Sequence, residues 1–175
     1  TINGTVGTAI PAFDTMFTTG CGVATAVSVV VSGGVATATM PSGLTFERDS
    51  VVLVAGATPS ALNGEARVLS ATTTQITFAT TAADGAATGT ITIRYAPQTS
   101  WVKAFGATNK AAYKSTHVQA SGHHLRIDDT GTTTARIRGF ETMSDVDTGT
   151  GPFPTDAQVS GGGYWWKSTV ANTSA

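Results

Sequence analysis

Alternation of apolar and polar residues is the dominant pattern along this chain. In the stretch TGTITIRY, Ile91, Ile93 and Tyr95 fall on one side of an extended backbone, and the residues between them fall on the other. A period of two predicts a half-buried β-strand, because successive side chains of a strand point to opposite faces. The stretches HLRID, 124–128, and ARIRGF, 135–140, alternate in the same way. The pattern predicts a mainly β fold.

The middle of the chain, residues 49–97, contains several short runs of this kind. Turn-forming pairs such as Asn63-Gly64 and Asp84-Gly85 separate them. We therefore expect a four-stranded antiparallel meander, closed as a small barrel or sandwich. The runs cover residues 51–54, 66–69, 75–78 and 89–95.

The first 48 residues predict a helix and then a hairpin. Phe13, Met16 and Phe17 recur at helical spacing after Pro11, so we expect one short helix near residues 11–19 that closes at Gly20. Two β-rich runs follow, and the glycines of 32–34 between them predict a tight turn, since glycine supplies positive φ angles at low cost.

These elements predict antiparallel β-sandwich or barrel-like units with one short N-terminal helix. We expect residues 1–48 and 98–175 to form a sandwich-like body, with 49–97 as a small barrel-like module inserted into it. Three units in series are the alternative. The polar segment 145–163 is predicted to be an irregular, shaped loop, and the small polar residues before Ala175 are typical of a linker towards a further domain.

Composition narrows the classes of partner. Charged residues make up 12% of the chain, about half the usual share, and the net charge is -1. No basic run is present, so we expect no direct nucleic-acid partner. We also expect no membrane span, because no run approaches the about 20 apolar residues required. A surface with few charges favours self-association, and we expect a homo-oligomer.

The histidines and the single cysteine are the first candidates for chemistry. Neighbouring strand residues point to opposite faces, so His123 and His124 cannot both reach one metal ion, and we expect structural histidines. A metal-dependent hydrolase built on His123, His124 and Asp128 is the enzymatic alternative. Cys21 has no cysteine partner in the chain and is predicted to be a small buried residue. We predict no catalytic residue and no cofactor.

Asp145 and Asp147 begin the sequence DVDTGTG, which is similar to the first half of a calcium-binding loop. The glycine comes one position early, and the twelfth position is an aspartate, Asp156, where such loops have a glutamate. We therefore expect a turn in which the aspartates accept hydrogen bonds from backbone N–H groups, with cation binding as the alternative.

Large aromatic residues gather in the last quarter of the chain. They are candidates for a subunit interface, because tyrosine and tryptophan bury a large area at low entropic cost. Adjacent tryptophans on a strand face opposite ways, so one of Trp165 and Trp166 is predicted to lie outside the core. The interface candidates are Phe153, Tyr164, Trp165 and Trp166.

Several stretches resemble a group of virion structural proteins of tailed bacteriophages. The likeness covers almost the whole chain, and the middle section separately resembles small β modules of phage tail and baseplate proteins. The stretches are NGTVGTAIPAFDTMFTTGCG, VSGGVATATMPSGLTFE, ALNGEARVLSATTTQITF, LRIDDTGTTTARIRGFETMSDVDTGTGPFP and GGGYWWKS.

The resemblance implies a building block of the phage particle with no catalytic residue. We expect a tail-associated component, such as a tail-tip, baseplate or adaptor part, that acts through symmetric subunit contacts and contacts with other virion proteins. It would be located in the virion and assembled in the cytoplasm of the bacterial host. A capsid decoration protein is one alternative. The other is a module that binds host-surface carbohydrate through Tyr164, Trp165, Trp166 and His123.

Overall fold

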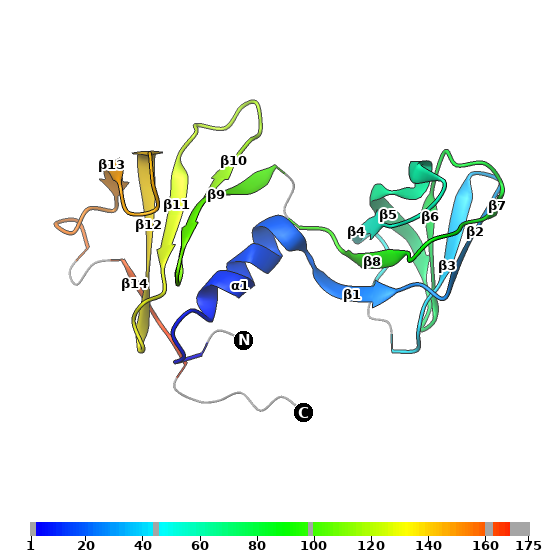
Figure 1. Ribbon diagram of the computed structural model, residues 1–175, viewed down its shortest axis with the longest axis horizontal. Helices are drawn as coiled ribbons and strands as arrows, with labels where there is room; N and C mark the ends of the chain where they lie inside the picture. Colours follow the sequence, from blue (N-terminus) through cyan, green and yellow to red (C-terminus); the bar gives the residue numbers. More distant parts are fainter. Residues whose placement is uncertain (1–2, 44–45, 98–99, 160–162, 169–175) are drawn as a thin grey trace. The chain divides into compact units, whose positions relative to one another are not determined.

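The computed structural model describes residues 3–43, 46–97, 100–159 and 163–168. The chain divides into two compact units, here called the terminal unit, Thr1–Thr19 with Gln98–Ala175, and the middle unit, Gly20–Pro97. Both are built on antiparallel sheets, and a short α-helix lies near the N-terminus (Figure 1). The predicted fold class is confirmed.

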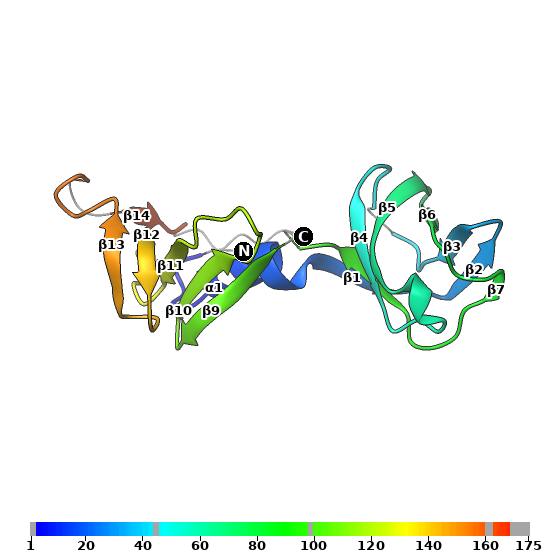
Figure 2. The same ribbon diagram turned by 90° about the horizontal axis from the view of Figure 1, so that it is seen from above.

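The middle unit is one eight-stranded antiparallel sheet that curls into a half-barrel (Figure 2). A short 3-10 turn, η2 (Ser60–Leu62), precedes β5. Across the sheet the strands follow the order β1 (Cys21–Thr25), β8 (Thr92–Tyr95), β4 (Val51–Ala55), β5 (Gly64–Ala71), β6 (Gln75–Ala79), β3 (Val35–Thr39), β2 (Ser28–Ser32) and β7 (Gly85–Ala86).

The concave side of this sheet holds a hydrophobic core of mostly aliphatic side chains. Alternation places Val29 and Val31 of β2 inside, with Ile76 and Phe78 of β6 nearby in the same cluster. Strand β8 covers only 92–95 of the run predicted over 89–95, and within it Ile93 is buried between the half-buried Thr92 and Arg94. The predicted alternation is confirmed over that shorter range. The hairpin at 32–34 is confirmed as well, since β2 pairs with β3 and both glycines of the turn have positive φ.

The predicted meander is correct for three of its strands and wrong for the fourth. The strands β4, β5 and β6 are neighbours in sequence order. Strand β8, however, pairs with β4 and β1, whereas β6 pairs with β3. The hairpin β2–β3 extends the sheet beyond β6. The pairing of β3 with β6 joins distant parts of the chain, so the local alternation of residues does not predict it.

Because of these long-range pairings, the middle unit begins at Gly20 and not at the predicted residue 49. Residues 20–48 belong to the middle unit, because β1 pairs with β8 and β3 pairs with β6. The division therefore differs from the predicted one, in which the module begins at 49. Cys21 is also not buried: it lies exposed on β1, a strand at the edge of the sheet.

The terminal unit is a six-stranded antiparallel sheet with a helix against one face (Figure 1). Strand β14 pairs with the start of β12, and β13 pairs with its end. The elements are α1 (Ala9–Asp14), the π-helical turn η1 (Thr15–Thr19), β9 (Trp101–Ala107), β10 (Lys110–Ser115), β11 (His124–Asp128), β12 (Thr134–Met143), β13 (Gly149–Phe153) and β14 (Tyr164–Trp166).

The predicted helix near 11–19 is observed as α1 continued by η1, and it buries one face on the sheet. Ile10 and Phe13 pack in one cluster with Tyr113 of β10 and Ile127 of β11. The helical segment ends at Gly20, whose φ of +74° is a conformation that other residues rarely adopt.

Strand β13 contradicts the prediction of an irregular loop over 145–163. Gly149, Gly151 and Pro152 are poor strand residues, yet the segment pairs with β12 through its backbone. A strand with an open edge tolerates proline, because its missing N–H need not serve a neighbour. The ring of Phe153 also requires Gly139 opposite it, since a Cβ at that position would lie 2.1 Å from the ring.

A buried ion pair joins the distant ends of the terminal unit. The side chains of Asp129 and Lys167 are 0% and 1% exposed and form a salt bridge. Lys167 also donates to the carbonyl of Gly131 at 2.6 Å, and Asp129 accepts from the backbone N–H of Ala9 at 2.7 Å. The pair thereby holds the start of α1, the β11–β12 turn and the residue after β14 together.

Candidate functional site

The face of the terminal sheet opposite α1 is polar. Successive residues of β11 point to opposite faces, so Ile127 points towards the helix and Arg126 and Asp128 point away from it. The pairing of β11 with β12 places Arg138 opposite Arg126 and Arg136 opposite Asp128. The arginines of this face are paired: Arg126 contacts Asp128 at 3.0 Å, and Arg136 and Arg138 contact Asp156. Ion pairs thus cover this face along β11 and β12.

Asp145 and Asp147 lie in a turn at the rim of this face. The carboxylate of Asp145 accepts from the backbone N–H of Asp147 at 3.1 Å, as predicted for an aspartate turn. The carboxylate of Asp147 instead pairs with Lys110 at 2.9 Å and with Arg126. These two hydrogen-bonded cations hold the pKa of Asp147 below its ordinary value. A cation at Asp147 would compete with both partners.

The three histidines are not gathered at one point. His124 is buried and stacks on Phe105 with ring centroids 5.8 Å apart, whereas His123 is exposed and meets the edge of Phe153. Burial lowers the pKa of His124, and the charges of Lys114 and His123 lower it further. Among the residues that the structure describes, no group of three or more His, Cys, Asp or Glu side chains could hold a metal ion.

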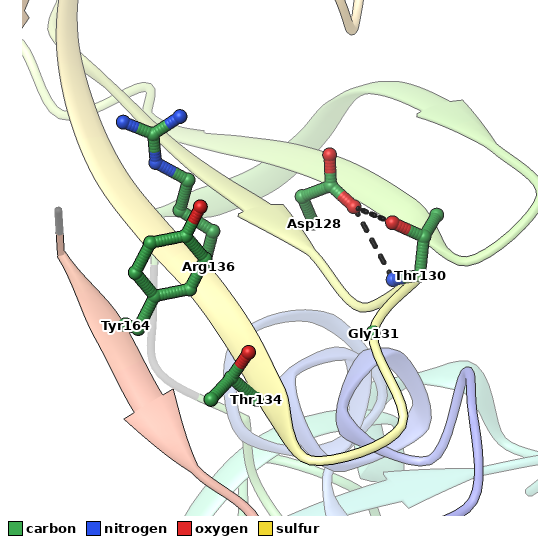
Figure 3. A pocket seen from close by; sticks show the side chains of 6 residues that line it. All are labelled: Asp128, Thr130, Gly131, Thr134, Arg136 and Tyr164. Atoms are coloured by element: carbon green, nitrogen blue, oxygen red, sulfur yellow. Dashed lines mark hydrogen bonds between the residues drawn. The ribbon is translucent and has the colours of Figure 1, made fainter. Parts of the chain in front are cut away.

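A pocket lies on the polar face where β11, β12 and β14 meet (Figure 3). Its volume is about 210 Å³. Tyr164 and Arg136 stand on one side, Asp128 and Thr130 stand on the other, and Thr134 lies at the foot (Figure 3). The lining residues are Asp128, Thr130, Gly131, Thr134, Arg136 and Tyr164.

The register explains why these residues converge. Asp128 is the partner of Arg136 across β11 and β12, and Arg136 is the partner of Tyr164 across β12 and β14. Directly paired residues share a face, so the three side chains form one row. The turn that follows β11 adds Thr130 and Gly131 to the row.

The carboxylate of Asp128 is ionised in this pocket. Burial alone would raise its pKa, but hydrogen bonds from the hydroxyl and the N–H of Thr130 and from Arg126 outweigh burial. The pKa of Asp128 is therefore below its ordinary value. The hydroxyl of Thr130 donates to this carboxylate at 2.6 Å. Asp128 is fixed in place and presents an acceptor to the pocket.

Beside the pocket, β14 carries three partly exposed aromatic residues. Tyr164 lies over Arg136, with 5.4 Å between the ring centroid and the guanidinium carbon, and Trp165 contacts Phe13 with ring centroids 5.9 Å apart. Trp166 is opposite Thr134 and is 84% exposed, and no ring contact involves it among the described residues. The predicted opposite orientation of the two tryptophans is confirmed.

The edge strands of the two sheets differ in how they are protected against pairing with another chain. Strand β7 has two residues, β1 and β9 carry bulges in their pairing, and β13 contains Pro152. Short length, bulges and proline are devices that block edge-to-edge association. Strand β14 is short as well, but it has no charge, proline or bulge. Within the described ranges, no strand covers its outer side.

In comparisons with known proteins, no protein family, curated protein or solved structure matches the chain. In the part of the chain that the structure describes, no helix is long and apolar enough to cross a membrane.

Sequence reasoning singled out the aromatics of β14 but missed the pocket beside them. Thr130, Thr134 and Arg136 are common surface residues with no motif between them. The available signal was the alternation itself, because it places Thr134 and Arg136 on the face opposite Ala135 and Ile137. The pairing of β14 with β12, which adds Tyr164, is not visible in the sequence.

Proposed function

We propose that this protein is a structural component of a bacteriophage particle, associated with the tail, and that it acts through contacts between copies of the chain. The observation that carries the proposal is Trp166, a large aromatic side chain that is 84% exposed on an edge strand without charge, proline or bulge. A largely exposed indole is costly to leave in water, and tryptophan is among the commonest anchors of protein interfaces.

The proposed contact is between the β14 strands of two copies. Strand β14 has three residues, so its backbone adds few hydrogen bonds, and most of the buried area would come from the aromatic rings. Trp165 is partly held by Phe13, which limits the number of conformations it loses when it is buried. The partner is a second copy of the chain, and the contact is symmetric.

Two further features support a role in assembly. Charged residues make up 12% of the chain and the net charge is -1, so copies do not repel one another strongly. The resemblance of long stretches, including GGGYWWKS, to virion structural proteins supports a phage particle as the assembly. The likeness of the middle section to tail and baseplate modules supports the tail as its location.

Mass spectrometry and electron cryomicroscopy of purified particles of the encoding phage test this proposal. We expect the chain in the particles in several symmetric copies, with its density at the tail. Absence from the particles would contradict the structural role. Density on the head alone would contradict the tail location and favour capsid decoration.

A further inference from the structure

We infer that the pocket formed by Asp128, Thr130, Gly131, Thr134, Arg136 and Tyr164 binds one neutral monosaccharide unit of a larger glycan. The pocket lies on the polar face of the terminal sheet, with an aromatic ring on one side and a carboxylate on the other (Figure 3). No step of assembly requires this combination of groups.

The size of the pocket selects a small ligand. Its volume of about 210 Å³ is below the roughly 300–1,000 Å³ of pockets for drug-sized molecules. One sugar ring fits that space, and the remainder of a glycan would leave through the open side. The rigid sheet and the short β11–β12 turn form the walls, so the pocket is largely preformed.

Tyr164 supplies the apolar surface that a sugar ring requires. It is 46% exposed, and its ring is held in place by Arg136, whose guanidinium carbon lies 5.4 Å from the ring centroid. The face of an aromatic ring is electron-rich, and the C–H bonds on one side of a pyranose present a weakly positive surface to it. The contact costs little conformational entropy because the ring is already positioned.

The opposite wall supplies hydrogen-bonding groups of both kinds. The carboxylate of Asp128 is ionised and fixed by Thr130 and Arg126, so it accepts from a sugar hydroxyl without rearrangement. The hydroxyls of Thr134 and Tyr164 have no hydrogen-bond partner within the described part of the chain and can both donate and accept. A polyol matches such a mixed set, because each hydroxyl is itself a donor and an acceptor.

The charges around the pocket disfavour an anion. Arg136 is the only cationic residue of the lining, and its guanidinium already pairs with Asp156. Asp128 adds a fixed negative charge within the pocket. A phosphate or a uronic acid would be placed next to that charge without a free cation, so the ligand is neutral.

This inference stands apart from the proposed role in assembly. The pocket is lined by Tyr164 of β14, whereas the proposed subunit contact uses the outer edge of β14 and Trp166, which lies beside Thr134 on the same face of the sheet. A protein that binds sugar and stays monomeric, or one that assembles and binds no sugar, would separate the two proposals.

The test is an NMR titration of the ¹⁵N-labelled full chain with methyl glycosides of glucose, galactose, mannose and N-acetylglucosamine. We expect at least one glycoside to shift the amide resonances of Thr130, Gly131, Thr134 and Tyr164, with a dissociation constant in the millimolar range typical of one small ligand. Inorganic phosphate and methyl glucuronide serve as anionic comparisons and are expected to shift none of them.

Two variants locate the site, and a third is their control. Tyr164→Ala removes the aromatic wall and should weaken binding about tenfold or more, while Thr134→Val keeps the shape, removes one hydroxyl and should weaken binding about fivefold. Thr132→Val makes the same change at an exposed neighbour outside the lining and should leave the dissociation constant unchanged. The same spectra report whether each variant is folded.

Three results would overturn the whole inference, and a fourth would overturn its assignment of a neutral ligand. The first is that no glycoside shifts the pocket amides, and the second is that the shifts cluster elsewhere on the protein. The third is that Thr134→Val binds as tightly as the wild type. Binding of phosphate or glucuronide in preference to every neutral glycoside would overturn the assignment of a neutral ligand.

Discussion

The middle unit and the terminal unit are both built on antiparallel sheets, but their interiors are stabilised in different ways. The middle unit encloses a core of sixteen buried apolar residues within its curl. The terminal unit has a core of seven under α1, and it depends in addition on the buried Asp129–Lys167 pair and on ion pairs over the opposite face. Hydrophobic burial is non-directional, whereas hydrogen-bonded charges require exact partners.

The two units also differ in the functional sites that we propose for them. The pocket and the aromatic strand β14 both belong to the terminal unit, where polar side chains are held by specific partners. The middle unit offers a stable sheet with protected edges. We therefore expect the middle unit to be insensitive to changes of charge and pH, and the terminal unit to respond to both.

Two features of composition allow the units to be observed separately. All three tryptophans, Trp101, Trp165 and Trp166, belong to the terminal unit, so tryptophan fluorescence reports on its unfolding alone. All three histidines belong to it as well. Each unit has its own core, so we expect two unfolding transitions, which amide resonances resolve during a urea titration.

The largest expected effect is that of Lys167→Ala. The substitution leaves the carboxylate of Asp129 buried without its cation, and breaking a buried pair in this way costs about 3–5 kcal/mol. We expect the fluorescence transition to move to lower urea while the middle-unit resonances keep their midpoint. Lys114→Ala, which changes a partly exposed lysine of β10, is the control and should have a small effect. A terminal unit unchanged by Lys167→Ala would contradict the structural role of the pair.

Phe78→Ala is the converse experiment in the middle unit. Phe78 is 1% exposed in the centre of the core, and removing a buried phenylalanine side chain costs about 3–5 kcal/mol. The middle-unit resonances should lose their native dispersion at lower urea, while tryptophan fluorescence keeps its midpoint. If both transitions moved together, the two units would not be the independent structures that their separate cores indicate.

Tyr113→Phe should have an intermediate effect on the terminal unit. The hydroxyl of Tyr113 donates to the carboxylate of Asp14 at 2.8 Å, and this bond fixes the end of α1 over the sheet. Loss of a hydrogen bond to a charged group costs about 1.5–3 kcal/mol. This bond is only partly buried, and Lys103 also pairs with Asp14 at 2.9 Å and will retain part of the contact. We expect a loss near the lower end of that range in fluorescence-monitored unfolding. A value near zero would show that Lys103 alone positions the helix.

The smallest expected effect is a pH dependence confined to the terminal unit. The pKa of His124 is lowered in the folded state by burial and by the nearby charges of Lys114 and His123. The unfolded chain therefore takes up a proton first, and the stability of the terminal unit should fall as pH drops through about 6.5.

His124→Gln should remove most of this dependence between pH 7 and 5. His117→Gln is the matched control, because His117 is exposed in a turn. The middle unit contains no histidine, and its midpoint should not change over this interval. A pH dependence that persists in His124→Gln would assign the titration to another group.

Features set by a few neighbouring residues could be predicted from the sequence, whereas features set by pairing between distant strands could not. Alternation located β11 and β12, and the glycines at 33 and 34 located the β2–β3 turn, because both signals are confined to a few neighbouring residues. The pairing of β8 with β4 and the unit boundary at Gly20 depend on residues far apart in the chain. The local alternation of apolar and polar residues therefore predicts neither the pairing nor the boundary.

The same distinction applies to single residues. Lys167 is a charged residue near the end of the sequence, and lysine normally lies at the surface. Its ion pair with Asp129 nevertheless makes it one of the most buried side chains of the terminal unit. Cysteine is among the most often buried residue types, yet Cys21 lies exposed on an edge strand. Strand β13 forms despite its glycines and proline, since the long strand β12 provides its hydrogen-bonding partner.

Sedimentation equilibrium of the purified full chain measures whether copies of it associate through β14, as we claim. We predict a reversible self-association that Trp166→Ala weakens by about tenfold or more, while Val118→Ala, at a side chain that is 93% exposed on a loop away from β14, leaves it unchanged. A wild-type chain that remains monomeric at high concentration, or an association unaffected by Trp166→Ala, would contradict the claim.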